Sequence, residues 1–210
     1  MSGWAVERRR GRAAELHGLA WPSPLTRNVW VLEVERPAIV LGSAQVADGL
    51  EPPTDVDVVR RRSGGGAVWL APGGTLWVDV LLPRGDALWD DDVSRSARWL
   101  GEVWAAALTG RPAVVHAGPM VHTAHSATFC FAGTAPGEVT QEPGGPKLVG
   151  ISQRRTRAGA RFQCVAYAEW SPRPLAGALG IPDAEVERTG AGAGDLAALE
   201  AAFLAALPAF

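Results

Sequence analysis

The chain has 210 residues, of which 47% are hydrophobic and 20% are charged, which is enough for one domain with a full core. Its net charge of -2 gives no basic field, and its arginine clusters lack interleaved aromatic residues, so we expect no nucleic-acid binding. No apolar run approaches a membrane span, and the first residues have no signal-peptide core. We therefore expect a cytoplasmic protein that does not contact a membrane.

The first half of the chain is typical of short strands. Residues up to Leu19 predict a short helix, and residues 28–42 predict two strands interrupted near Pro37, because Val and Ile dominate and proline cannot donate to a ladder. Residues 56–61, 67–70 and 75–83 predict three more strands. With the glycines between them, they indicate a meander with a glycine elbow at its centre.

The second half begins with the clearest helical pattern, residues 88–110. Val93, Ala97, Leu100, Trp104 and Leu108 repeat at helical spacing and predict one apolar stripe. Three acids at its start, residues 90–92, predict helix capping rather than a magnesium site. Short strands are expected at 113–116, 127–133, 138–141, 147–152 and 160–170, with a last helix at 195–207.

No regular alternation of strands and helices is present, and strands come early with helices between and after them. This order predicts an α+β fold in which a mixed or antiparallel sheet is flanked by helices. We expect a single domain over residues 1–210.

Two glycine-rich segments are candidates for ligand binding. The first, "RRRSGGGAV" (60–68), places three glycines whose amides can line an anion-binding concavity, although it matches neither a P-loop nor a dinucleotide motif. The second, "GGPKLVGISQRR" (144–155), contains Lys147, the only lysine of the chain. Its ammonium can neutralise a carboxylate or a phosphate. The alternatives are a hairpin turn for the first segment and a solvated lysine for the second.

Together with "RPAIVLGSAQ" and "CFAG", these segments follow the order and spacing of a known family. Over roughly residues 38–168 the chain resembles the lipoate-protein ligase A family, whose catalytic domain is shared with biotin ligases and octanoyltransferases. The resemblance implies a fold similar to the class II aminoacyl-tRNA synthetase core. It also implies an ATP- and Mg²⁺-dependent ligase that joins lipoate or octanoate, through an acyl-adenylate, to a lysine. The implied acceptors are lipoyl domains of 2-oxoacid dehydrogenase E2 subunits or the glycine cleavage H protein.

The resemblance also implies the site residues. Lys147 would be catalytic, contacting the acid oxygens and the α-phosphate. The acyl and phosphate pocket would be lined by Arg61, Ser63, Gly64, Gly65, Gly66, Ala67, Gly150, Ile151 and Ser152. Trp69, Trp77 or Val149 would suit as walls around an aliphatic chain. No metal ligands are expected, since His116, His122 and His125 fall in a predicted loop without tight spacing.

Cys130 leaves a second mechanism open. It precedes the lysine segment about where the octanoyltransferase branch carries its nucleophile, so it could accept an acyl group from acyl carrier protein without ATP. The alternative is a buried cysteine that acts as a small apolar residue. Composition also leaves a disulfide between Cys130 and Cys164 open.

Three departures from the family pattern favour further alternatives. Cys164 stands where the family usually shows a histidine, and Gly73-Gly74 stands where it often shows Gly-Asn. No C-terminal accessory domain is expected after residue 210, which favours a transferase or a ligase with a separate accessory subunit. A non-catalytic module that binds lipoate, biotin or an adenylate is the alternative of another class.

Overall fold

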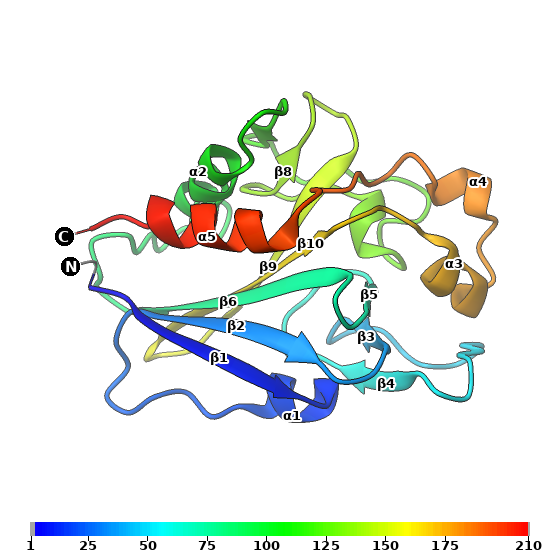
Figure 1. Cartoon of the computed structure of the whole chain (residues 1–210), viewed down its shortest axis with the longest axis horizontal. Helices are drawn as coiled ribbons and strands as arrows, with labels where there is room; N and C mark the ends of the chain where they lie inside the picture. Colours follow the sequence, from blue (N-terminus) through cyan, green and yellow to red (C-terminus); the bar gives the residue numbers. More distant parts are fainter. Residues whose placement is uncertain (1–2, 210) are drawn as a thin grey trace.

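The computed structural model describes residues 3–209, and its largest element is a seven-stranded mixed sheet (Figure 1). Only β1 and β2 at one edge are parallel; every other neighbouring pair is antiparallel. In sheet order the strands are β1 (Ala5–Gly11), β2 (Asn28–Val34), β6 (Thr75–Pro83), β10 (Gly159–Tyr167), β9 (Lys147–Arg155), β8 (Val139–Thr140) and β7 (Val114–Val115). The predicted α+β class with a mixed sheet is confirmed.

A second sheet has three strands, in the order β4 (Asp57–Arg60), β3 (Ala38–Leu41) and β5 (Val68–Leu70). β3 runs parallel to β4 and antiparallel to β5. The predicted meander is therefore wrong, because β5 and β6 lie in different sheets. Between them, the Thr75 hydroxyl accepts from the Ala71 amide at 3.1 Å and Gly74 donates to the Ala71 carbonyl at 3.2 Å. This tight turn sends the chain from one sheet to the other.

The helices partly match their predictions. They are α1 (Ala13–Gly18), α2 (Arg98–Ala107), α3 (Arg173–Leu179), α4 (Asp183–Val186) and α5 (Leu196–Ala206). Asp195 caps α5 by accepting from the amides of Ala197 and Ala198. The predicted N-terminal helix is wrong over residues 5–11, where mostly exposed residues instead form an edge strand along β2. Among the described residues, no helix is long and apolar enough to cross a membrane.

The long helix predicted at residues 88–110 is shorter in the structure, and its acidic cap is wrong. α2 begins at Arg98, and its N-cap residue makes no side-chain hydrogen bond. Asp90 and Asp92 instead close turns ahead of the helix, where they accept from backbone amides and both pair with Arg95. Val93 is correspondingly exposed, whereas the other four members of the stripe are buried.

The large sheet separates two apolar cores. Figure 1 shows α2 and α5 on one side of it and α1 with the small sheet on the other. The strand β10 serves both, because its side chains alternate: Phe162 and Cys164 pack toward α2 and α5, and Val165 and Tyr167 pack toward the small sheet. On the first side Trp104 stacks on Phe203 with ring centroids 4.0 Å apart.

A buried ion pair lies on the small-sheet side. Asp79 is fully buried, and its Oδ2 lies 2.5 Å from Nη2 of Arg161. Trp77 donates to the other carboxylate oxygen at 2.8 Å. Arg161 also donates to the carbonyls of Leu16 and His17, so the pair anchors α1 to the sheet. Burial raises the pKa of Asp79, and the Arg161 guanidinium opposes that rise.

We expect Asp79→Asn to lower the free energy of unfolding by about 3–5 kcal/mol, because Arg161 would keep its charge without a counterion. Urea denaturation measures the loss. The control is Glu200→Ala, which removes the surface pair with Arg8 and should cost less than about 1 kcal/mol. Equal losses in the two variants would contradict the role assigned to Asp79.

Candidate active site

Lys147 lies at the start of β9 with its side chain 1% exposed. Its Nζ is 2.6 Å from Oε2 of Glu138 and donates to the Cys130 carbonyl at 2.8 Å. The Phe131 ring lies 5.3 Å from the same nitrogen. The solvated lysine that the sequence left open is therefore wrong. Two charges withdrawn from water need this close pairing to offset their lost hydration.

Glu138 is the residue that the sequence analysis missed. Its Oε1 accepts from the Ile151 amide at 3.0 Å and its Oε2 from the Ala135 amide at 2.6 Å. The carboxylate therefore joins Lys147 to the turn before β8 and to the middle of β9. The need of a buried lysine for a counterion was the available signal, but nothing in the sequence says which of the 22 acids supplies it.

The buried side chain of Arg61 supports the glycine loop, residues 64–66, through hydrogen bonds. It is 4% exposed, and its Nη2 donates to the carbonyls of Gly64 and Gly66 at 2.8 Å each. Burial lowers the pKa of Arg61. Gly65 has a φ of +99°, a conformation that favours glycine. The loop therefore has a fixed shape set by a buried guanidinium.

Ser63, Ser152 and Gln163 join this loop to the large sheet. Ser63 Oγ donates to Gln163 Oε1 at 2.7 Å and lies 3.0 Å from Ser152 Oγ. On the other side, Gln163 Nε2 donates to Nδ1 of His17 at 3.1 Å. The chain of bonds crosses from the glycine loop through β9 and β10 to α1.

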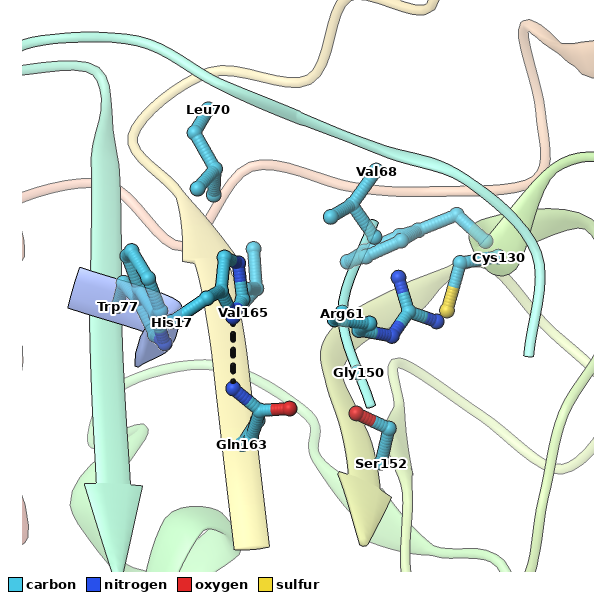
Figure 2. Close-up of a pocket in the computed structure, with 11 residues that line it drawn as sticks. His17, Arg61, Val68, Leu70, Trp77, Cys130, Gly150, Ser152, Gln163 and Val165 are labelled. Atoms are coloured by element: carbon cyan, nitrogen blue, oxygen red, sulfur yellow. Dashed lines mark hydrogen bonds between the residues drawn. The ribbon is translucent and has the colours of Figure 1, made fainter. Parts of the chain in front are cut away.

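A narrow apolar slot lies between the two sheets (Figure 2), with about 20 Å³ of space accessible to a water-sized sphere. Cys130 and Arg61 lie at one end of it and Trp77 with His17 at the other. The slot is lined by His17, Arg61, Val68, Leu70, Trp77, Cys130, Phe131, Gly150, Ser152, Gln163 and Val165.

Of the three predicted wall residues, only Trp77 lines the slot. Val149 packs in the core under α2 and α5, and Trp69 packs beside the small sheet. Cys164 also faces the α2 and α5 core, where burial raises its pKa. Because neighbouring residues of a strand point to opposite faces, it is Gln163 that faces the slot. Cys164 therefore does not form part of the slot wall.

A wider cleft, with about 740 Å³ of space accessible to a water-sized sphere, adjoins the slot. The predicted residues Gly64, Gly65, Gly66, Lys147, Ile151 and Ser152 line it, together with Glu138. Ala67 is fully buried behind them and lines neither hollow. Cys130 and Ser152 line both the cleft and the slot. They therefore mark the place where the two hollows meet.

Cys130 lies on a turn and not on the strand predicted at residues 127–133. It begins the 3₁₀ helix η1 (Cys130–Ala132), and its amide donates to the Ala67 carbonyl at 2.9 Å. Figure 2 shows its sulfur beside the Arg61 guanidinium. The residue is half-buried and its thiol is free, as is that of Cys164. No disulfide joins the two cysteines.

The histidines do not form a metal site. His125 pairs with Glu185, and His116 contacts the Pro119 carbonyl. Within residues 3–209, no group of three or more His, Cys, Asp or Glu side chains could hold a metal ion.

His17 is a second site residue that the sequence analysis missed. Its ring packs against Trp77 with centroids 4.4 Å apart. Burial, with help from the charges of Arg161 and Arg61, lowers the pKa of His17 to about 3. The imidazole is therefore neutral near pH 7. A lone histidine on a short N-terminal helix gave no sequence signal.

Comparison with solved structures shows which proteins share this fold. The fold is similar to solved lipoate protein ligases, including a lipoate-protein ligase A bound with ATP (16% identity, 98% of this chain and 84% of that chain, TM-score 0.67). The bi-partite ligase of Thermoplasma acidophilum, described with its E2 lipoyl domain, matches at 16% identity over 98% and 81% of the two chains (TM-score 0.68). P. falciparum LipL1 in complex with lipoate matches at 13% over 97% and 59% (TM-score 0.61).

The family model for the lipoyl protein ligase A/B catalytic domain matches residues 21–194. The chain belongs to this family. A search of curated protein sequences gave no match.

We expect Gly66→Ala to disturb the Cys130 turn, because an added Cβ would lie 2.6 Å from the Cys130 amide nitrogen. The backbone on both sides would have to move, so the thermal midpoint should fall by several degrees. Gly64→Ala is the matched control, since no atom lies within 4 Å of its added Cβ. A scanning calorimeter compares the two, and equal midpoints would show that the turn is not packed as described.

The depressed pKa of His17 predicts a pH-dependent stability. Unfolded His17 binds a proton below about pH 6.5, whereas the folded residue does not until about pH 3. The free energy of unfolding should therefore fall as pH drops from 7 to 5, with His17 contributing about 1–2 kcal/mol. In His17→Phe this contribution should vanish, while the carboxylates contribute equally to both proteins. Parallel pH profiles from urea denaturation would contradict a neutral, buried His17.

Proposed function

We propose that the protein transfers a lipoyl or octanoyl group to a lysine of a lipoyl domain, and that Cys130 carries the acyl group. The observation that carries this proposal is the position of Cys130, where the apolar slot meets the open cleft. An acyl chain in the slot would place its carbonyl at the sulfur. Membership of the lipoyl protein ligase A/B family supports the same class of reaction.

The proposed reaction has two steps, acylation of Cys130 and transfer of the acyl group to the acceptor lysine. The Cys130 thiolate attacks the carbonyl of an acyl carrier protein thioester; a new C–S bond forms, and the carrier thiol leaves with a proton. The acceptor lysine amine then attacks the Cys130 thioester; the amide bond forms, and the Cys130 thiol is regenerated. The Arg61 guanidinium lies beside the sulfur, so its positive charge faces the reacting atom.

Lys147 would stabilise the oxyanion of both steps. An ammonium has three N–H donors, and here Glu138 and the Cys130 carbonyl take two. The third would face a developing negative charge at the Cys130 turn. A fixed positive charge in a site that excludes water is an effective form of transition-state stabilisation.

A second candidate is the ATP-dependent ligase that the resemblance favours. The wide cleft supports it, because Gly64–Gly66 and Lys147 line a space that is open enough for a nucleotide. The similar lipoate-protein ligase A was solved bound with ATP. ATP would supply the energy to activate the free acid as an acyl-adenylate. Asp92 lines the cleft but is engaged with Ser94 and Arg95, so Mg²⁺ would have to enter bound to the phosphates.

The proposed acceptors are the lipoyl domains of 2-oxoacid dehydrogenase E2 subunits or the glycine cleavage H protein. The solved bi-partite ligase is described with its E2 lipoyl domain, which supports this choice and the possibility of a separate accessory subunit. We propose that residues 1–210 act as one catalytic domain with such partners.

Intact mass of an apo lipoyl domain separates the two routes. One tube holds this protein with octanoyl-acyl carrier protein, and a second holds it with lipoate, ATP and magnesium. We expect a mass gain in the first tube that is lost in Cys130→Ser, since serine lacks a nucleophilic thiolate. Cys164→Ala is the control and should retain the gain, because Cys164 faces the other core.

A gain in the second tube alone, unchanged in Cys130→Ser, would establish the ligase and refute the thioester route. Absence of any gain, with tight binding of the acid by calorimetry, would indicate the non-catalytic binding module.

A further inference from the structure

The end of the slot opposite Cys130 carries a polar atom without a partner. Nε2 of His17 is inaccessible to solvent and makes no hydrogen bond within the described part of the chain, although the ring lines an otherwise largely apolar slot. A buried polar atom that stays unpaired is unfavourable, and such atoms are uncommon in folded proteins. Among the unpaired buried nitrogens of the described residues, only His17 Nε2 and Arg61 Nε belong to residues that line the slot, and His17 is the one at the far end.

The hydrogen-bond network indicates which ring nitrogen of His17 carries the proton. Ser63 donates to Gln163 Oε1, which turns the amide nitrogen of Gln163 toward Nδ1 of His17. With the Gln163 amide in this orientation, Nδ1 accepts that bond and bears no hydrogen. A neutral imidazole has one N–H, and it is therefore on Nε2. The far end of the slot presents a hydrogen-bond donor.

The neighbours of His17 leave no acceptor for this N–H. The Asp79 carboxylate is engaged by Arg161 and by the Trp77 indole, and the guanidinium of Arg161 is itself a donor. Trp77, against which the ring packs, offers only an N–H, already given to Asp79. This N–H has no acceptor among the described residues, so a molecule that enters the slot could supply one.

We propose that His17 selects acyl groups whose far end carries a hydrogen-bond acceptor, and so favours the dithiolane ring of a lipoyl group over an unsubstituted hydrocarbon end. The inference rests on the proposed use of the slot for an acyl chain. Sulfur is a weak acceptor, and a polarizable sulfur also packs favourably beside an aromatic ring such as Trp77. An octanoyl methyl group would leave the His17 N–H buried and unpaired. The slot is narrow, so its walls must part for either chain.

The test compares two acids of one shape. Lipoate and 5-cyclopentylpentanoate share the five-membered ring and the four-carbon tether, but only lipoate has sulfur. Calorimetry on the whole chain measures Kd for both. We expect wild type to bind lipoate about 3- to 10-fold more tightly, the range of one net hydrogen bond, and His17→Phe, which keeps the aromatic packing, to bind both acids about equally.

Two further variants show that the effect is specific. Val165→Ala removes part of a slot wall and leaves His17 unchanged. It should therefore weaken the binding of both acids and preserve the ratio of their Kd values. His17→Gln restores an N–H donor and should recover part of the preference. Circular dichroism confirms that each variant is folded.

Equal affinities in wild type, a ratio unchanged in His17→Phe, or no binding of either acid would each overturn the inference. The readout is binding, so it stands apart from transfer. Loss of the proposed function alone would appear as preserved discrimination between the two acids with no acyl group delivered to the lipoyl domain.

Discussion

The buried contact among Lys147, Glu138 and the Cys130 carbonyl holds the candidate site together. Each partner belongs to a different segment: the start of β9, the turn before β8 and the η1 turn. Removing either charge would leave the other buried and unpaired, which strongly lowers the free energy of unfolding. The ion pair therefore fixes where the Cys130 sulfur stands relative to the sheet.

The apolar slot and the open cleft both lie beside this ion pair and the Cys130 turn. The small sheet packs over one face of the large sheet and leaves an apolar slot between them, while the glycine loop borders the cleft outside. Arg61 is tied to the carbonyls of this loop and reaches the sulfur from inside. The arrangement separates an apolar compartment from an open one, with the Cys130 thiol between them. This separation would suit the proposed transfer of a long acyl chain to a protein amine.

The parts of this account that sequence predicts are those with local signals. Alternation and β-branched residues located β2, β3, β6 and β10. The glycine loop stood out by its three consecutive glycines, and Lys147 stood out as the only lysine of the chain. The pairing of β5 with β3 depends on contacts distant in sequence, so the meander was wrong. The predicted capping of α2 by the acidic residues 90–92 was wrong because short Asp side chains also accept hydrogen bonds from backbone amides in turns. The local sequence pattern does not distinguish a helix cap from a turn. Glu138 and His17 were missed because their importance comes from a buried lysine and an apolar slot that exist only in the folded chain.

The central claim is that Cys130 carries the acyl group. It is tested most directly by incubating the protein with octanoyl-acyl carrier protein alone, quenching in acid and measuring its intact mass. We expect an octanoyl adduct that maps to the peptide with Cys130 and is released by neutral hydroxylamine, as a thioester would be. A protein that stays unmodified under these conditions, yet acylates a lipoyl domain when given lipoate and ATP, would contradict it.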